Sequence, residues 1–209
     1  MTVGLRELKK QQTRQAISDT ATRLFLKNGF EAVTISEIAA AAQVAKMTVT
    51  NYFPRKEDLA LDVHETFAAG LADAVTARPT GESALAAVRR DILAAIDRHD
   101  PVAGFSGTDF VRMITASPTL TTRLRDLHDQ REQALAQVLA ADPAANDNPE
   151  APRIVAALLG AASRTLFWQI MDLTLDGRSN EDIATTVTRS AHHAFGLLEP
   201  ALAGYAVRA

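Results

Sequence analysis

The side chains of this sequence best suited to recognition chemistry lie between Lys46 and Asn51, where a lysine, two threonines and an asparagine fall within six residues. Val49 and Phe53 are four residues apart, so in a helix they share one face and leave the polar side chains on the other faces. A short helix that presents one cation and several small hydrogen-bonding groups suits the major groove of DNA, where base edges display donors and acceptors. The stretch therefore predicts recognition of base pairs.

Two helices and a turn must position these side chains. The first helix begins at a capping box, because Thr34 and Glu37 stand three residues apart and each side chain can bond to the backbone N–H of the other. Its apolar residues follow at helical spacing: Ile35, Ile38, Ala39 and Ala42. Gln43 lies in the turn, and the second helix runs from about 45 to 53. Pro54 ends that helix, because a residue before proline disfavours the helical conformation.

The order and spacing of these residues resemble the N-terminal signature of the TetR family of bacterial transcriptional regulators. The resemblance covers about residues 10 to 62. The matching residues are Thr34, Ile38, Ala39, Ala42, Val44, Thr48, Tyr52, Phe53, Lys56, Glu57 and Leu59. Three residues depart from the signature: Gln43 replaces a turn glycine, Ala45 a capping serine, and Thr50 a frequent aromatic. We therefore expect a side-chain-bearing residue in the turn and a less well capped second helix.

The resemblance implies which residues contact DNA. Those expected to face base edges are Lys46, Met47, Thr50 and Asn51. A lysine can donate to guanine, an asparagine can pair with adenine, and methyl groups can touch thymine. Those expected to contact phosphates, which fix the register without reading the sequence, are Thr34, Thr48, Tyr52 and Lys56. Alternatively, Thr34 is only a cap, Tyr52 is mainly core, and Lys56 is a solvated charge. Lys9, Lys10 and Arg14 could add an N-terminal arm or contacts to the DNA backbone.

Charge is distributed unevenly along the 209 residues. Residues 1–60 carry nine Lys or Arg and six Asp or Glu, and every lysine lies at or before Lys56, although the net charge of the chain is −3. A basic first third followed by an acidic remainder predicts a polyanionic partner for the first third. The absence of cysteine excludes disulfides, zinc–thiolate sites and thiol nucleophiles.

The rest of the chain reads as helix, so we predict an all-α fold of about nine helices. An N-terminal three-helix helix-turn-helix domain (1–55) would join a C-terminal helical ligand-binding and dimerisation domain (56–209). The fourth helix is expected to run unbroken from about 56 to 77. The last two helices, about 153–175 and 180–198, are apolar on more than one side, which predicts a homodimer built through them, as the resemblance also implies. The alternative is that both are simply central core.

The resemblance also implies a small, largely apolar effector held between the helices of the second domain. Aromatic residues with a few polar groups are typical of such pockets. The candidates are Phe67, Phe105, Phe110, Met113, His128, Arg164, Phe167, Trp168 and Met171. Each of them could equally be an ordinary core residue.

Catalytic and metal-binding patterns are absent from the sequence. His192 and His193 are adjacent and diverge by about 100° on a helix, the other histidines are scattered, and no glycine-rich phosphate loop occurs. We expect no enzyme activity, no metal and no cofactor. No apolar run reaches the length needed to span a bilayer and the N-terminus is polar, so we expect no membrane association and a cytoplasmic location.

Together these patterns predict a ligand-responsive DNA-binding transcriptional regulator. Two helix-turn-helix domains of a homodimer would occupy successive major grooves of a palindromic operator in double-stranded DNA. A small molecule would release this repressor from the operator. The alternatives are an activator or effector-independent regulator of the same family, and a helical protein-interaction module whose helix-turn-helix is only architectural.

Overall fold

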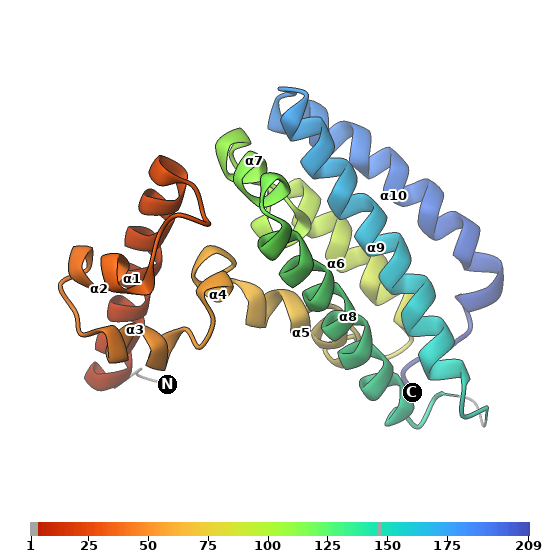
Figure 1. Cartoon of the computed structure of the whole chain (residues 1–209). Helices are drawn as coiled ribbons and strands as arrows, with labels where there is room; N and C mark the ends of the chain where they lie inside the picture. Colours follow the sequence, from red (N-terminus) through yellow and green to blue (C-terminus); the bar gives the residue numbers. More distant parts are fainter. Residues whose placement is uncertain (1–3, 146–147) are drawn as a thin grey trace. The chain divides into compact units, whose positions relative to one another are not determined.

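The computed structural model describes residues 4–145 and 148–209, and every regular element in these residues is a helix (Figure 1). This confirms the predicted all-α fold. The helices are α1 (Leu5–Asn28), α2 (Ile35–Ala41), α3 (Lys46–Tyr52), α4 (Lys56–Ala60), α5 (His64–Thr76), α6 (Ala84–Asp97), the 3-10 helix η1 (Pro101–Ala103), α7 (Thr108–Ala116), α8 (Pro118–Ala140), α9 (Ala151–Leu175) and α10 (Asn180–Leu202).

These helices form two compact units that interleave along the chain. Unit 1 contains the chain up to His64 together with Arg112–Arg123, and unit 2 contains Glu65–Val111 and Leu124–Ala209. The helix α8 therefore contributes its first turns to unit 1 and the remainder to unit 2. The functional boundary between 1–55 and 56–209 remains a prediction.

Side chains of α8 and of the turn before it fasten residues 112–123 within unit 1. The buried Arg123 donates hydrogen bonds from Nε and Nη2 to Oδ1 of the buried Asp58, at 3.0 and 2.8 Å. Ser117, at the start of α8, donates from its hydroxyl to Oε1 of Glu31 at 2.6 Å. These contacts join the start of α8 to α4 and to the loop that follows α1.

The core of unit 1 is built from apolar residues at helical spacing on α1 and on the helix-turn-helix. α1 packs against α2 and α4, and α2 packs against α3. The largest fully buried side chains of unit 1 include Ile17, Phe25, Ile38, Phe53 and Leu59. The face of α3 that carries Val49 and Phe53 is thereby fixed inward.

The expected unbroken helix from about 56 to 77 is wrong: the chain forms two helices, α4 and α5, and this break raises the number of α-helices in the described residues to ten. Leu61 leaves the helical region with φ −108° and ψ 55°. Arg14 donates from Nη2 to the carbonyl oxygen of Asp62 at 2.9 Å, and Ser18 donates from its hydroxyl to the Asp62 carboxylate. Residues 60–64, where the break lies, include no glycine or proline, so contacts with α1, distant in sequence, hold the break.

Unit 2 is a helical bundle in which α10 packs against α6 and α9 (Figure 1). Its core contains Ile96, Leu135, Leu159, Val187 and Phe195, all fully buried. α9 has 25 residues and an 18-residue window of mean hydropathy 1.4, so by length and composition it could cross a membrane, contrary to the expectation from the sequence. Half of that window is buried inside the protein, as in the core helix of a bundle.

Candidate nucleic-acid interface and buried cavity

The turn between α2 and α3 depends on a residue in the left-handed conformation. Gln43, which stands in place of the expected glycine, has φ 55°. The backbone N–H of Val44 donates to the carbonyl oxygen of Ala39 at 3.0 Å, which closes the turn. A residue with a Cβ in this conformation costs about 1–2 kcal/mol, so the turn is formed at some expense in stability.

The two helices of the motif are capped differently. At α2, the Glu37 N–H donates to Thr34 Oγ1 at 3.2 Å and the Thr34 N–H donates to Glu37 Oε2 at 2.7 Å, the predicted capping box. The backbone N–H of Thr34 lowers the pKa of the exposed Glu37 carboxyl. At α3, Ala45 stands at the N-cap and no side chain caps the helix. Its first N–H groups are thus left to water or to another acceptor.

α3 buries one face and presents the other to solvent. Val49 is fully buried, and Lys46 and Asn51 are exposed. Met47 is 69% exposed, which is unusual for a large apolar side chain. Thr50 is half-buried and its hydroxyl donates to the carbonyl oxygen of Met47 at 3.1 Å, so its methyl group and the lone pairs of its hydroxyl oxygen are what it can offer a partner.

The residues expected at phosphates occupy more varied positions. The hydroxyl of Thr34 is engaged in the capping box, and Thr48 and Tyr52 are half-buried at the edge of α3. Lys56 is also half-buried: its Nζ donates to the carbonyl oxygen of Phe30 and lies 4.3 Å from the centre of that ring. An ammonium has three donors, so this contact leaves Lys56 able to donate to a phosphate as well.

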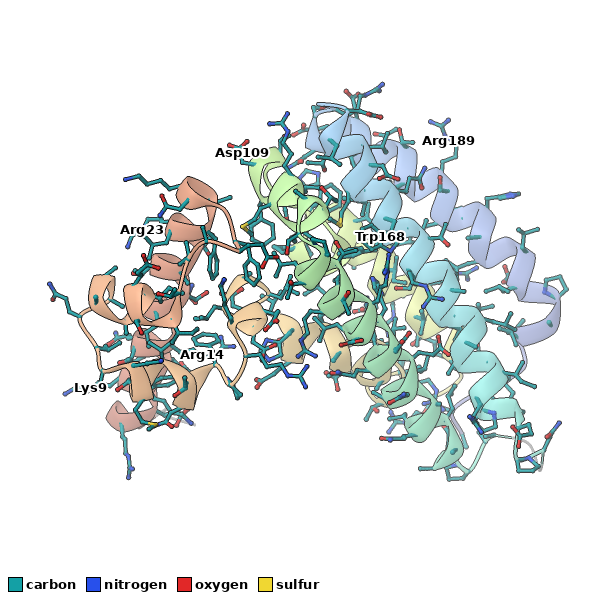
Figure 2. All side chains as sticks on the ribbon, in the orientation of Figure 1. Lys9, Arg14, Arg23, Asp109, Trp168 and Arg189 are labelled. Atoms are coloured by element: carbon teal, nitrogen blue, oxygen red, sulfur yellow. The ribbon has the colours of Figure 1, made fainter. Side chains whose placement is uncertain are left out.

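Tyr52 lines an open hollow together with the start of α1. The other lining residues are Arg6, Glu7, Lys9, Lys10 and Thr13. Arg6 was missed in the sequence analysis, although it lies three and four residues before the two lysines and so shares their helical face. Arg14 has a structural role, because its guanidinium carbon lies 4.7 Å from the centre of the Phe53 ring. Lys9 and Arg14 are both labelled in Figure 2.

Comparison with known proteins places this motif in a family. The model of the bacterial regulatory proteins of the tetR family matches residues 17–63. The HTH-type transcriptional regulator TcmR of Streptomyces glaucescens is 28% identical over 169 residues, which cover 78% of this chain and 75% of TcmR. Residues 17–63 therefore carry the DNA-binding region of the TetR family.

Further relatives extend the likeness over most of the chain. The HTH-type transcriptional repressor LfrR of Mycolicibacterium smegmatis is 28% identical over 189 residues, 87% of this chain and 89% of LfrR. A complex of SmeT with triclosan has a TM-score of 0.58 at 17% identity and covers 92% of both chains. NalD of Pseudomonas aeruginosa has a TM-score of 0.51 at 18% identity and covers 93% of this chain and 98% of NalD. At these identities the two structures show the fold alone.

Four of the residues predicted to line a ligand pocket form one aromatic cluster in unit 2. The ring of Phe67 lies 5.0 Å from that of His128 and 5.6 Å from that of Phe167, both in edge-on contact. Trp168 lies 5.9 Å from Phe167 and 6.5 Å from His128. Such edge-on contacts are favourable, so the cluster is a packed element of the bundle.

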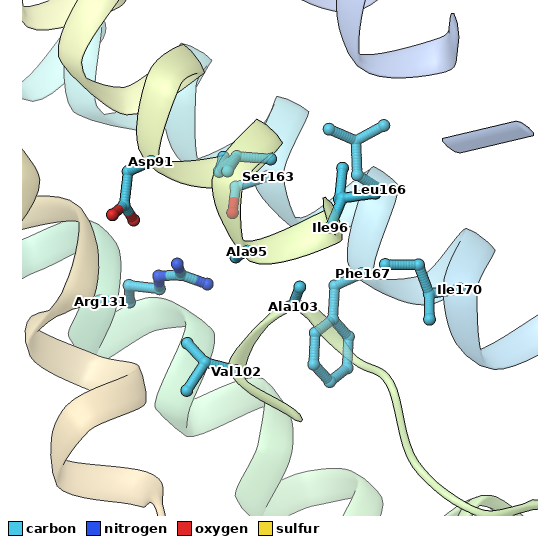
Figure 3. A pocket seen from close by; sticks show the side chains of 11 residues that line it. Asp91, Ala95, Ile96, Val102, Ala103, Arg131, Ser163, Leu166, Phe167 and Ile170 are labelled. Atoms are coloured by element: carbon cyan, nitrogen blue, oxygen red, sulfur yellow. The ribbon is translucent and has the colours of Figure 1, made fainter. Parts of the chain in front are cut away.

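Phe167 also borders a cavity of about 30 Å³ inside unit 2 (Figure 3). The walls are mainly apolar, but three polar side chains reach them: Asp91 from α6, Arg131 from α8 and Ser163 from α9. Sequence reasoning missed these three. Arg131 follows His128 by three residues and therefore shares its helical face, a spacing that could have indicated it.

The remaining pocket candidates lie elsewhere. Phe105 and Met171 are buried, and the Phe105 ring lies 5.0 Å from His99. Phe110 and Met113 are half-buried on α7, and Arg164 forms a partly exposed ion pair with Asp129 at 3.8 Å. None of these side chains lines the cavity of about 30 Å³, and their contact with a ligand stays a prediction. Among the described residues, no group of three or more acidic or histidine side chains could hold a metal ion.

Proposed function

We propose that this TetR-family protein is a cytoplasmic transcriptional repressor that binds a palindromic operator as a homodimer and is released by a small molecule. The observation that carries the proposal is the outer face of α3. Lys46, Met47 and Asn51 are exposed there, while Val49 opposite them is fully buried. A helix with its inner face locked into a core and a polar outer face is what reading a major groove requires.

Base recognition and backbone binding fall to different parts of unit 1. Lys46 and Asn51 can make hydrogen bonds to guanine and adenine, each good pair contributing about 1–3 kcal/mol of discrimination. Thr48 and Tyr52, both half-buried on α3, are candidates for phosphate contacts, and Thr34 and Lys56 are the other two. The basic residues of the hollow beside Tyr52, among them Arg6, add sequence-independent attraction.

Exposed apolar residues on the last two helices support dimerisation through them. Ile154 and Leu158 stand four residues apart on α9 and are 55% and 39% exposed, and Leu197 on α10 is 68% exposed. Residues at this spacing form a stripe on one face of a helix. A second copy that covers the stripe would remove this apolar surface from water.

The continuous helix α8 is the element that we propose carries the response to the effector. It bears Arg123, which is bound to Asp58 of α4, and two turns later it bears Arg131 at the cavity. A cavity of about 30 Å³ is far smaller than the ~300 Å³ or more of ordinary ligand pockets, so an effector must displace the surrounding helices, α8 among them. Effector binding can weaken operator binding only if the effector binds the two arrangements of the helices with different affinities.

The same small cavity supports a second candidate, an effector-independent regulator of the same family. If side chains fill the interior of unit 2, no ligand can enter it. The helix-turn-helix would then bind the operator without regulation by a small molecule. Both candidates predict operator binding, and only the first predicts its release by a small molecule.

The experiment that tests the proposal is fluorescence anisotropy with the DNA upstream of the protein's own gene, across a salt series. We expect tight binding, and the logarithm of the association constant should fall by about 0.9 per phosphate contact for each tenfold rise in salt concentration. Lys46→Ala should weaken binding by about 5- to 150-fold. Lys27→Ala, at the opposite end of α1 from Lys9, removes the same charge from an exposed position and should leave affinity nearly unchanged. Equal, sequence-blind binding by all three proteins would refute the DNA-reading role.

A further inference from the structure

Arg131 is a buried charge in apolar surroundings. The residue is 5% exposed, and its guanidinium carbon lies 4.7 Å from the centre of the Phe67 ring. Its Nε has no hydrogen-bond partner. Burial lowers the pKa of Arg131 to about 10, so the group is still protonated at neutral pH. A buried cation of this kind is costly unless something pairs with it.

Among the described residues, the other two buried arginines are paired within the protein. Arg78 binds the carboxylate of Asp142 and the carbonyl oxygens of Val75 and Ala206. Arg123 makes two hydrogen bonds to Asp58. In the described part of the chain Arg131 has no such salt bridge. The protein therefore pairs its buried guanidinium groups where they are structural and leaves one unpaired at the cavity.

The groups nearest Arg131 do not replace such a partner. Asp91 borders the same cavity, but no salt bridge or hydrogen bond joins it to Arg131 among the described residues. Burial raises the pKa of Asp91, and the positive charge of Arg131 lowers it. His128 is 5% exposed with Nε2 unpartnered, and burial, followed by the charge of Arg131, lowers its pKa to about 3, so it is neutral at physiological pH.

The cavity has a polar and an apolar side. Figure 3 shows the Arg131 guanidinium and Asp91 on one side, and Leu166, Phe167 and Ile170 on the other. The buried Ser163 adds a hydroxyl to the wall. A carboxylate accepts well-aligned hydrogen bonds from a guanidinium and a further one from a hydroxyl.

We infer that the effector is an amphipathic anion whose carboxylate, or an equivalent oxyanion, binds Arg131 while its apolar part packs against Phe167 and Ile170. The inference rests on the effector-responsive function proposed above, and it replaces the expectation of a largely apolar effector by one with a charged head. A cavity of about 30 Å³ has room for one or two water molecules, so the apolar part enters by displacing side chains of α6 and α9. Asp91 is not bonded to Arg131, but its negative charge borders the same cavity and opposes the entry of an anion.

The test compares acids with their neutral counterparts. Benzoate, cinnamate, octanoate and decanoate, each with its primary amide, are titrated into the full-length dimer by calorimetry and into the operator complex by anisotropy. We expect at least one acid to bind and release the operator, about 10- to 100-fold more tightly than its amide. The amide has the shape of the acid without its charge, so the ratio isolates the charged contact.

Variants assign the effect to Arg131. Arg131→Gln should remove the preference for the acid, and Arg131→Lys should retain part of it. Asp91→Asn should tighten binding of the acid, because it removes a negative charge from the cavity wall. This outcome keeps the test decisive even if Arg131→Gln fails to fold. Arg125→Gln, at an exposed arginine of α8, is the matched control and should behave as the wild type.

Three outcomes would overturn the inference. Acids and amides could bind alike, the acid preference could survive Arg131→Gln, or no acid could bind at all. If a neutral or cationic compound releases the operator instead, the anion inference fails while the effector-responsive function stands. If the operator binds tightly and no compound of any charge releases it, the effector-responsive function fails as well and the DNA-binding role remains.

Discussion

Removing one partner of the Asp58–Arg123 ion pair should destabilise unit 1 strongly. Both side chains are buried, at 4% and 8% exposure, and two hydrogen bonds of 3.0 and 2.8 Å join them. Arg123→Met leaves a buried carboxylate without a partner, and Asp58→Leu leaves a buried guanidinium. For such buried pairs, loss of one member costs about 3–5 kcal/mol. Replacing both by apolar residues removes both desolvation penalties, so the double variant should cost less than either single one.

Hydrogen exchange read by mass spectrometry is the suitable assay, because it reports the stability of each unit separately. A loss of about 3 kcal/mol corresponds to exchange more than 100-fold faster in peptides of α4 and the start of α8. The control is Arg89→Met, which breaks the partly exposed Arg89–Glu199 pair of 3.1 Å and should cost less than about 1 kcal/mol. If the two single effects simply add in the double variant, the residues do not interact and the reasoning fails.

Three further expectations follow from other features. Gln43→Gly should stabilise the protein by up to about 1 kcal/mol, because relief of the left-handed conformation at φ 55° outweighs the added freedom of the unfolded chain; a lower melting temperature would contradict this. The capping box lowers the pKa of Glu37. The stability that the ionised carboxylate contributes should therefore be present above the pKa of the unfolded state and lost as pH falls through the pKa of the folded state. The melting-temperature difference between wild type and Glu37→Gln should accordingly shrink between about pH 5 and pH 3, and a constant difference would argue against the charged cap. Leu197→Glu should shift the protein from dimer to monomer in analytical ultracentrifugation, whereas Leu26→Glu, at an exposed leucine of α1, should not; an unchanged mass for the first variant would place the interface elsewhere.

The helix-turn-helix could be predicted from the sequence because its determinants are local. The capping box joins Thr34 and Glu37 across a single turn of helix, and the inward face of α3 is set by Val49 and Phe53. The left-handed conformation of Gln43 was foreseeable for the same reason, because a residue that replaces a turn glycine has to adopt the backbone conformation of that glycine. Each inference needed no knowledge of distant residues.

The rest could not be predicted because it depends on residues far apart in the chain. The break after α4 is held by Arg14 and Ser18, more than 40 positions before Asp62. The contact of Lys56 with the carbonyl oxygen of Phe30 likewise spans 26 positions. The charge at the cavity is harder still to foresee. Arg131 stands out because no acid pairs with it, and a missing long-range partner leaves no mark on the sequence around it.

The interleaving of the two units limits how this regulator can be recombined with others. A chimera that joins residues 1–64 to the body of another family member would leave behind Ser117 and Arg123, the partners of Glu31 and Asp58. The transplanted helix-turn-helix domain would then carry the buried carboxylate of Asp58 without its arginine partner. The transferable module is therefore discontinuous: a new specificity has to travel with residues 112–123, or the recipient must already carry an arginine opposite Asp58.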